Sequence, residues 1–249
     1  MKKNVVIVGG GLIGLALAYK YLLSYKKHRV ILIEKEADLG FHQSGRNSGV
    51  LHCGLSYKPN TLKAKLSVDG IKQMIDFCKV NEVNHDVCGK IVVANTDNEI
   101  KILENLAKRG FDNGLKKLKF LNNRELLKRE PYVRSKKTLL VPDEGIVDFI
   151  AVQKELAKKI VSMGGKIILS EEVLGVSKNN NNELITNKNT YGFDLLFNCA
   201  GLFTDRIFKK LSKTKPSLKI IPFRGEYFKL KEDYKKYINH LVYPVPNPK

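Results

Sequence analysis

The segment Val5–Gly14, with the sequence VVIVGGGLIG, constrains the fold of this chain more than any other stretch. The four apolar residues Val5–Val8 are typical of a buried parallel strand. Three consecutive glycines follow, and a helical pattern of apolar residues begins directly after them. Gly9, Gly11 and Gly14 have the spacing G-x-G-x-x-G. This order predicts a strand, a tight turn and a helix that pack closely together.

Each glycine has a predicted role. Gly9 allows the tight turn out of the strand, Gly11 lets a pyrophosphate approach the backbone, and Gly14 lets the helix pack on the strand. The phosphates would lie at the helix N-terminus, where free N–H groups and the helix dipole favour negative charge. A second strand, at 29–33, ends at Glu34, about 20 residues after the last glycine, where a carboxylate binds ribose hydroxyls. The sequence therefore predicts a dinucleotide site.

Two other interpretations of this region are open at the level of the sequence. A turn softened by glycines within the core is one, and a signal peptide preceded by Lys2 and Lys3 is the other. No A-x-A cleavage site follows, and the charged residues at 34–36 come too soon for a secreted start. The apolar stretch is also too short and too rich in glycine to span a bilayer. The succession of strand, glycines, helix, strand and acid favours the dinucleotide site.

The net charge of +19 comes mostly from lysines that are scattered along the 249 residues. The sequence has no long basic block and no basic stretch with interleaved aromatic residues, so we expect no nucleic-acid partner. Most of the lysines are expected on a solvated surface, and some near an anionic ligand. Weak attraction to the acidic inner face of a membrane is left open. A length of 249 residues suits one large or two small globular domains.

The four cysteines, at positions 53, 78, 88 and 199, form no C-x-x-C pair. This usage indicates a reducing compartment, and we expect a cytoplasmic protein, with peripheral contact at the inner membrane face left open. The spacing of His85 and Cys88 relative to Cys78 fits no standard metal site. The sequence therefore predicts no metal ligand.

The remaining pattern predicts alternating helices and strands. Asn60 or Thr61 is expected to cap a helix that runs to about residue 80. Further helices are expected at 97–109, 123–130, 149–163 and 204–211. Strands are expected at 90–94, 139–141, 166–169, 173–177, 184–186 and 195–199, with a polar hairpin tip at 179–182, an extended segment at 220–230 and a further strand from 241.

Two segments between these elements have features of ligand contacts. Residues 42–55 are rich in small and hydrogen-bonding residues and fit neither a helical nor a strand pattern. Residues 198–201, with the sequence NCAG, end an apolar strand with small residues at the carboxyl end of the expected parallel sheet. Arg224, beside a glycine in the extended segment, is a candidate clamp for a carboxylate. Lys63 and Lys65 oppose the dipole of their helix, a small cost that a bound anion would offset.

The order of elements predicts an α/β fold with two discontinuous domains. The dinucleotide-binding domain is expected at 1–88 and 142–216. An α+β substrate domain is expected at 89–141 and 217–249, and it is expected to be incomplete.

Segments throughout the chain resemble one known family. They are VVIVGGGLIGLALA, HQSGRNSGVLHCGLSYKPNTLKAKL, CGKIVVA, EPYVR, GIVDF, NCAGLFTDRI, IPFRGEYFKL and YPVPNP. Together they resemble the L-2-hydroxyglutarate oxidase/dehydrogenase family of D-amino-acid-oxidase-like flavoproteins. HQSGRNSG and PFRGEYF carry the specificity, since the glycine motif suits any dinucleotide binder. The resemblance implies a Rossmann-like domain with noncovalent FAD. It also implies oxidation of L-2-hydroxyglutarate to 2-oxoglutarate by hydride transfer to flavin N5.

The resemblance further implies which residues contact FAD. The three glycines of the motif would hold the pyrophosphate, and Glu34 would hold the adenosine ribose. Val173 would contact adenine through its backbone, whereas residues 47–49 would lie along the flavin. The implied cofactor-binding residues are Gly9, Gly11, Leu12, Ile13, Gly14, Glu34, Lys35, Asn47, Ser48, Gly49, Val173, Ala200 and Gly201.

The implied reaction needs a proton acceptor for the substrate hydroxyl and cations for two carboxylates. His52 is the predicted base, because imidazole titrates near the working pH, and His42 is the competing candidate. Arg224 is the first candidate cation, with two lysines behind it, and a tyrosine would hold the substrate in place. The predicted substrate-binding residues are Arg224, Tyr57, Lys63 and Lys65.

The sequence also departs from the family pattern. Arg46 stands where the family often has a histidine, so no catalytic role is predicted for it. Family members continue well past YPVPNP, and we therefore expect a fragment, or half of a split protein whose partner is a complementary C-terminal chain. Two alternatives stay open: a related flavoprotein that acts on glycerol 3-phosphate or an amino acid, and an inactive truncated chain. The electron acceptor, oxygen or a membrane quinone, is also left open.

Overall fold

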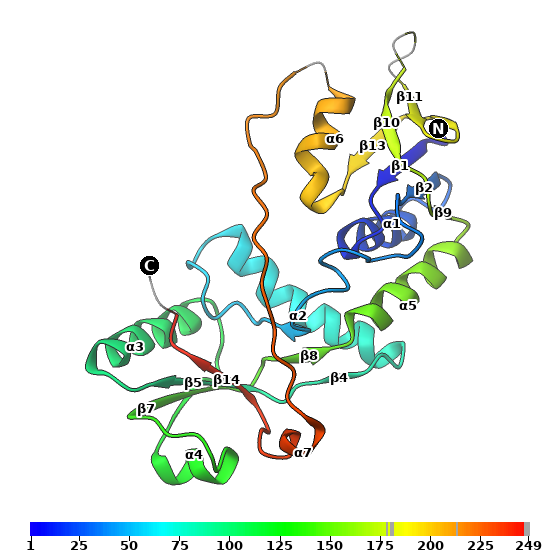
Figure 1. The fold of residues 1–249 in the computed structure, drawn as a ribbon. Helices are drawn as coiled ribbons and strands as arrows, with labels where there is room; N and C mark the ends of the chain where they lie inside the picture. The colour runs from blue at the N-terminus through cyan, green and yellow to red at the C-terminus, as the bar shows by residue number, and fades with distance from the viewer. Residues whose placement is uncertain (178, 180–181, 213, 247–249) are drawn as a thin grey trace. The chain divides into compact units, whose positions relative to one another are not determined.

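The structure is a computed structural model of the chain, and it describes residues 1–177, 179, 182–212 and 214–246 (Figure 1). The chain forms two compact units, each built from two separate stretches of sequence. Unit 1 comprises Met1–Ser48 and Phe149–Gly225, and unit 2 comprises Gly49–Asp148 and Glu226–Lys249.

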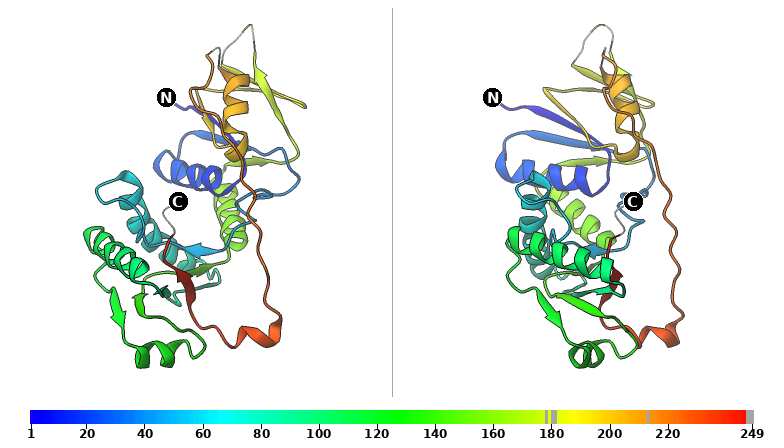
Figure 2. Two further views of the ribbon diagram at one scale, coloured as in Figure 1. Left: turned by 60° about the vertical axis from the view of Figure 1, so that its left-hand side comes forward. Right: turned by 90° about the vertical axis from the view of Figure 1, so that its left-hand side faces the viewer.

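Unit 1 is organised around a parallel sheet with the strand order β13-β1-β2-β9. The middle of strand β1 is fully buried, since Val5, Val6 and Ile7 are 0% exposed. Helices α1 and α5 pack against each other, as Figures 1 and 2 show. The bounds are β1 Asn4–Val8, α1 Leu12–Ser24, β2 Arg29–Ile33, α5 Phe149–Ser162, β9 Lys166–Ile168 and β13 Leu195–Asn198.

A small antiparallel sheet and one further helix complete unit 1. Helix α6 packs against β10, and a core cluster that includes Val6, Val173 and Ile207 joins the second sheet to the first. The bounds are β10 Val173–Val176, β11 Glu183–Thr186, β12 Thr190–Gly192, the 3₁₀ turn η1 Gly201–Phe203 and α6 Thr204–Leu211.

Unit 2 contains a mixed sheet with the strand order β14-β5-β7-β6, in which β14 and β5 are parallel and the other pairs antiparallel. A second sheet has the order β3-β8-β4. The strands are β3 Val50–Leu51, β4 His85–Asp86, β5 Lys90–Ala94, β6 Lys119–Leu121, β7 Lys137–Val141, β8 Gly145–Val147 and β14 Leu241–Pro244. The helices are α2 Leu62–Val80, α3 Asp97–Asp112, α4 Asn123–Arg129 and α7 Glu232–Lys235.

The structure confirms the predicted α/β class and most long elements. Thr61, one of the two expected caps, accepts a hydrogen bond from the N–H of Ala64 at 3.3 Å and begins α2. The short strands β3 and β4 were not predicted, because two residues carry no periodic pattern. Residues 218–231 form neither helix nor strand, so the predicted extended segment lacks a hydrogen-bonded ladder there. The predicted hairpin tip includes positions 180 and 181, which lie outside the described residues.

The two units divide the chain at other positions than the predicted domains. Residues 49–88 and 142–148 belong to unit 2, whereas residues 217–225 belong to unit 1. Antiparallel pairing of β3 and β4 with β8 holds the first of these segments in unit 2. The functional assignment of the domains stays a prediction.

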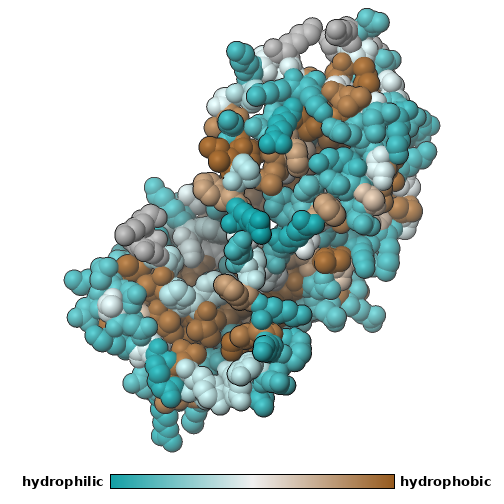
Figure 3. All heavy atoms as spheres, viewed as in Figure 1, coloured by the Kyte–Doolittle hydropathy of each residue, from teal (hydrophilic) through white to brown (hydrophobic). Residues whose placement is uncertain are grey.

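Hydrophilic residues cover much of the face drawn in Figure 3, with hydrophobic residues gathered in smaller groups. This agrees with lysines scattered over a solvated surface. None of the helices in the described part of the chain combines the length and the apolar character that crossing a bilayer requires.

Candidate functional site

The turn between β1 and α1 depends on two glycines. Gly9 has a φ angle of 109°, which disfavours any residue with a Cβ atom, and a Cβ there would lie 2.4 Å from the Cys199 carbonyl oxygen. A Cβ at Gly14 would lie 2.0 Å from the Gly9 carbonyl oxygen. The first turn of α1 therefore lies directly against the glycine loop.

Glu34, immediately after β2, is tied to this loop. The side chain is buried, with 8% exposure, and its Oε2 accepts a hydrogen bond from the N–H of Gly10 at 2.6 Å. Its Oε1 accepts another from the N–H of Glu36 at 2.9 Å. Each carboxylate oxygen can accept a further hydrogen bond, so Glu34 can hold the loop and still bind a hydroxyl group.

A cavity of about 480 Å³ lies in unit 1, where β1, β2 and β13 end. Its size is within the range of small-molecule sites, and the carboxyl edge of a parallel sheet is where such folds bind ligands. The predicted cofactor-binding residues that line it are Gly9, Gly11, Ile13, Glu34, Lys35, Val173, Ala200 and Gly201. Leu12, Gly14, Asn47 and Ser48 belong to unit 1 outside this lining, and Gly49 belongs to unit 2.

The segment from Gly40 to Ser44 also lines the cavity. Gly40 donates its N–H to the Gly10 carbonyl oxygen at 3.1 Å, and Ser44 Oγ accepts a hydrogen bond from the N–H of Leu12 at 2.9 Å. This bond satisfies one of the N–H groups that a helix N-terminus leaves unpaired. The sequence predicts ligand contact for 42–55, and the cavity receives the beginning of that segment. Sequence patterns gave no signal for the hydrogen bond between Leu12 and Ser44, because the two residues are 32 positions apart.

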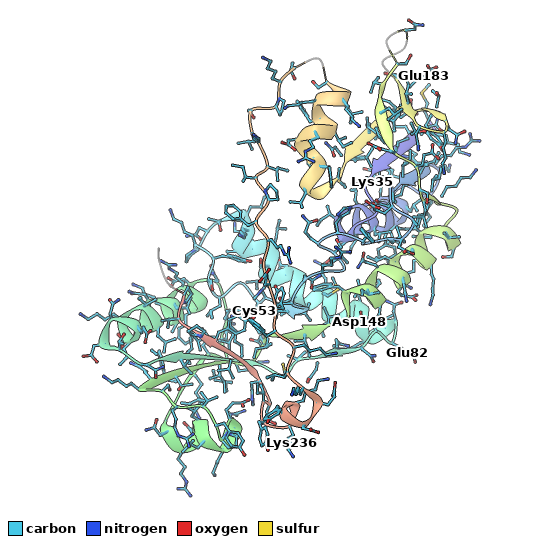
Figure 4. All side chains as sticks on the ribbon, in the orientation of Figure 1. Lys35, Cys53, Glu82, Asp148, Glu183 and Lys236 are labelled. Atoms are coloured by element: carbon cyan, nitrogen blue, oxygen red, sulfur yellow. The ribbon has the colours of Figure 1, made fainter. Side chains whose placement is uncertain are left out.

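Cationic side chains gather around Phe203 at the cavity. Lys35, labelled in Figure 4, has its Nζ 3.9 Å from the ring centroid, and the guanidinium carbon of Arg206 lies 5.0 Å from it. The rings of His42 and Phe203 are 5.5 Å apart. Sequence reasoning assigned no role to Phe203 and Arg206, although both lie in the segment NCAGLFTDRI, because only the small residues at its start have the pattern of a ligand contact. The two cations favour an anionic ligand in this cavity.

Glu36 balances part of that charge. Its Oε1 lies 3.2 Å from Lys35 Nζ and 3.0 Å from His42 Nε2. Hydrogen bonds from Lys35 and His42 hold the pKa of Glu36 below its ordinary value. His42, the competing candidate base, thus already contacts a carboxylate.

A second group of ionisable side chains lies in unit 2. The carboxylate of Glu144 is 1% exposed, and its Oε2 lies 3.1 Å from Lys90 Nζ and 3.5 Å from His52 Nδ1. Cys53 is fully buried and donates its Sγ–H to Glu144 Oε1 at 3.4 Å. The His52 side chain is 48% exposed. Sequence reasoning selected His52 but missed Glu144, which follows a proline and an aspartate in a pattern typical of exposed turns.

Burial and charge act in opposite directions on this group. Burial alone raises the pKa of Glu144, but contacts with His52 and the charge of Lys90 offset it, and the net pKa is lowered. Burial, followed by the Glu144 charge, raises the pKa of the Cys53 thiol. Glu144 is therefore an anion at neutral pH, and Cys53 is a neutral thiol.

The other predicted substrate residues are distributed over both units. Tyr57 and Lys63 are brought together, with Lys63 Nζ 4.4 Å from the ring centroid, and Asn113 donates to the Tyr57 carbonyl oxygen at 2.9 Å. Lys65 is exposed one residue after the buried Ala64 of the same helix. Arg224 is exposed, and it belongs to unit 1, whereas the other three belong to unit 2.

The cavity lies at the carboxyl ends of parallel strands, beside a glycine loop that is bonded to an acidic side chain. This is the arrangement found in dinucleotide-binding α/β proteins. The chain is a member of that class. A comparison with family models narrows the assignment: residues 4–249 match the DAO model, described as FAD dependent oxidoreductase. The chain therefore belongs to the FAD dependent oxidoreductase family.

Curated relatives share one name. The chain is 39% identical over 249 residues to L-2-hydroxyglutarate dehydrogenase of Indibacter alkaliphilus, covering 100% of this chain and 62% of that protein. It is 39% identical to the Escherichia coli K12 protein of that name, with 98% and 58% covered. For the mitochondrial protein of Homo sapiens the identity is 37%, with 98% and 55% covered. The chain spans less than two thirds of the length of these relatives.

Solved structures share the fold. L-α-glycerophosphate oxidase from Mycoplasma pneumoniae, solved with FAD bound, matches with a TM-score of 0.77 and 26% identity, covering 99% of this chain and 66% of that one. L-proline dehydrogenase from P. horikoshii has the same TM-score of 0.77 at 19% identity, with 98% and 64% covered. The second match shows the fold alone.

Proposed function

We propose that this chain binds FAD and oxidises L-2-hydroxyglutarate to 2-oxoglutarate. The observation that carries the proposal is the cavity beside the glycine loop, with Glu34 anchored to that loop. The name shared by relatives at 37 to 39% identity supports the substrate. The family to which the chain belongs supports the cofactor.

The residues at the cavity suit the adenosine diphosphate part of FAD. Gly9 and Gly11 line the cavity and have no side chain that would keep a phosphate away from the backbone, and the start of α1 favours a diphosphate. Glu34 would accept from the ribose hydroxyls, and Val173 would border the adenine through its backbone. Lys35 and Arg206 add positive charge at the same cavity. Leu12 and Gly14 would contribute as part of the helix N-terminus. The remaining length of the cofactor would be contacted by Asn47–Gly49, Ala200 and Gly201.

In the proposed reaction, bound FAD supplies the hydride acceptor at flavin N5. The protein must take the hydroxyl proton of the substrate and hold two carboxylates. His52 would accept the proton at the ring nitrogen that does not face Glu144. Arg224, Lys63 and Lys65 would bind the carboxylates, since guanidinium and ammonium groups form charge-assisted hydrogen bonds with them. Tyr57 would orient the substrate.

Two other functions compete with this proposal. The 26% identity to L-α-glycerophosphate oxidase favours a substrate of glycerol 3-phosphate type. The second competitor is a chain that becomes active only together with a complementary C-terminal chain. For reoxidation of the flavin, we propose oxygen or a membrane quinone as the electron acceptor.

The first test is the flavin spectrum. Purified chain mixed with FAD should retain a yellow flavin after gel filtration. Anaerobic L-2-hydroxyglutarate should then bleach it, whereas glycerol 3-phosphate or a D-amino acid should not. Bleaching by glycerol 3-phosphate instead would support the first competitor. Bleaching that needs an added C-terminal chain would support the second. Failure to retain flavin in both arrangements would refute the proposal.

His52 provides the second test. Because general base catalysis contributes about 10²- to 10⁴-fold, His52→Ala should slow anaerobic flavin reduction by about that factor and keep the bound FAD. His42→Ala is the matched control, since His42 is the other candidate base, and it should slow reduction less. An unchanged reduction rate in His52→Ala would remove His52 from the role of base.

A further inference from the structure

The pairing of two short strands places a buried acid beside the candidate base. β3 and β8 are antiparallel, with Val50 opposite Ile146 and Leu51 opposite Gly145. The next position in this register brings His52 opposite Glu144. Residues 92 positions apart in the sequence thus meet at one end of a three-stranded sheet. Cys53, labelled in Figure 4, marks this place in unit 2.

Glu144 is fixed from several sides. Lys90, at the start of β5, is buried and lies 3.1 Å from Oε2, while the N–H of Gly89 donates to the Glu144 carbonyl oxygen at 2.8 Å. Cys53 donates to Oε1. The Lys90 ammonium also lies 4.5 Å from the ring centroid of Tyr243 on β14. A carboxylate held in this way cannot turn towards solvent, so its contact with His52 has a fixed direction.

The contact distinguishes the two ring nitrogens of His52. Nδ1 faces Glu144 Oε2 at 3.5 Å, and the half-exposed side chain leaves Nε2 as the nitrogen that can meet a substrate. A carboxylate beside one ring nitrogen favours the tautomer with the proton on that nitrogen, which leaves the other nitrogen as a proton acceptor. In a base assisted by a carboxylate, that acid fixes the tautomer and orientation of the ring.

We propose that Glu144, held by Lys90, is a positioning residue that keeps His52 with its proton on Nδ1 and its Nε2 free to accept the substrate proton. The inference rests on the proposed function for its catalytic consequence. It adds Glu144 and Lys90, for which the sequence assigned no role, to the machinery of that reaction.

The test starts from a variant that removes the pair without leaving a buried charge. Lys90→Met/Glu144→Leu replaces a buried ion pair with apolar side chains of similar size, a change that folded proteins often tolerate. Flavin reduction by L-2-hydroxyglutarate should slow, but by less than the loss of about 10²- to 10⁴-fold expected for His52→Ala, because the imidazole remains present. Glu144→Gln, which keeps an acceptor for Nδ1–H, should recover part of that rate.

A double-mutant cycle separates positioning from a general structural effect. In the His52→Ala background, Lys90→Met/Glu144→Leu should cause no further slowing, because residues that act as a unit are not additive. Lys137→Met/Glu104→Leu is the matched control, since it removes another Lys–Glu pair of unit 2 and should leave the reduction rate unchanged. Independent, multiplicative slowing by the Lys90/Glu144 change would overturn the proposal.

A second measurement does not depend on activity. Nitrogen-15 chemical shifts of the neutral His52 ring should show the proton on Nδ1 in the unaltered chain, and this preference should be lost in Lys90→Met/Glu144→Leu. A proton on Nε2 in the unaltered chain would overturn the proposal. If the unaltered chain shows the Nδ1 tautomer but no flavin reduction, the proposed function fails, whereas the positioning contact stands.

Discussion

At the scale of single residues, the glycine motif offers a direct test of packing. A Cβ at Gly14 would meet the Gly9 carbonyl oxygen at 2.0 Å, so Gly14→Ala must push α1 away from the loop. We expect a loss of about 1–3 kcal/mol in the free energy of unfolding, as for other overpacked sites, and weaker FAD binding. Denaturant titration and FAD titration of the variant measure the two effects.

Gly70 provides the matched control for that substitution. It also lies in a helix, α2, but nothing lies within 4 Å of a Cβ built on it. Gly70→Ala should therefore raise the free energy of unfolding by about 0.5–1 kcal/mol, since alanine loses less backbone entropy in a helix. Equal destabilisation by both substitutions would mean that the contact with Gly9 does not determine the cost.

The residues of the glycine loop could be predicted from sequence because their spacing is local and serves one mechanical purpose. Glu34 was predicted for the same reason, although its hydrogen bond to the Gly10 N–H was not. Glu144 could not be predicted, because its burial depends on the pairing of β3 with β8. Two-residue and three-residue strands leave no periodic signal, so the environment of His52 became visible only in the folded chain.

At the scale of elements, Glu130 anchors the residues that lead into β14. The side chain is fully buried, and its Oε1 accepts hydrogen bonds from the N–H of Asn239 at 2.8 Å and of His240 at 2.6 Å. Glu130→Ala would leave these groups unpaired, at a cost of about 1–3 kcal/mol. The N–H groups of Leu241 and Val245 donate to the carbonyl oxygens of Gly89 and Val93, and they should then exchange with deuterium faster.

Glu125→Ala is the control for this release of β14. Glu125 lies in α4, the helix that ends one residue before Glu130, and its carboxylate accepts from the N–H of Asn122 at 3.0 Å as part of a capping box. Its removal should destabilise the start of α4 without changing exchange at β14. Unchanged exchange at Leu241 in Glu130→Ala would show that strand pairing alone holds β14 in place.

Periodic elements were predictable, whereas the pairing between distant strands was not. The apolar faces of α2 and α3 and the apolar runs of β1 and β5 are properties of each segment, and the structure has them at the expected positions. Parallel pairing of β14 with β5 joins segments about 150 residues apart, and only the folded chain specifies it. In the predicted extended segment at 220–230, by contrast, a local pattern is present without a pairing partner strand in the described part of the chain. Its pattern suits a strand, but residues 218–231 have no ladder in this structure.

At the scale of the whole molecule, both units are discontinuous in sequence, and they divide the chain at other positions than the predicted domains do. The sequence shows where elements begin and end, whereas unit membership follows from which strands pair. Residues 49–88 join unit 2 through β3 and β4, neither of which has a sequence signature. The predicted flavin residues Asn47 and Ser48 therefore end one stretch of unit 1, and Gly49 begins unit 2.

The proposed flavin contacts at residues 47–49, where the unit boundary falls in the sequence, can be tested by comparing amide exchange with FAD and with ADP. ADP carries only the part of FAD that the cavity of unit 1 is proposed to bind, so it should slow amide exchange at the glycine loop alone. FAD should slow exchange there and also at residues 47–49, the proposed flavin contacts. At concentrations about 100 times its Kd, FAD should raise the free energy of unfolding by about 2.7 kcal/mol. Hydrogen–deuterium exchange with each ligand measures both effects. Identical protection by ADP and FAD would mean that residues 47–49 do not contact the flavin, although the nucleotide site in unit 1 would remain supported.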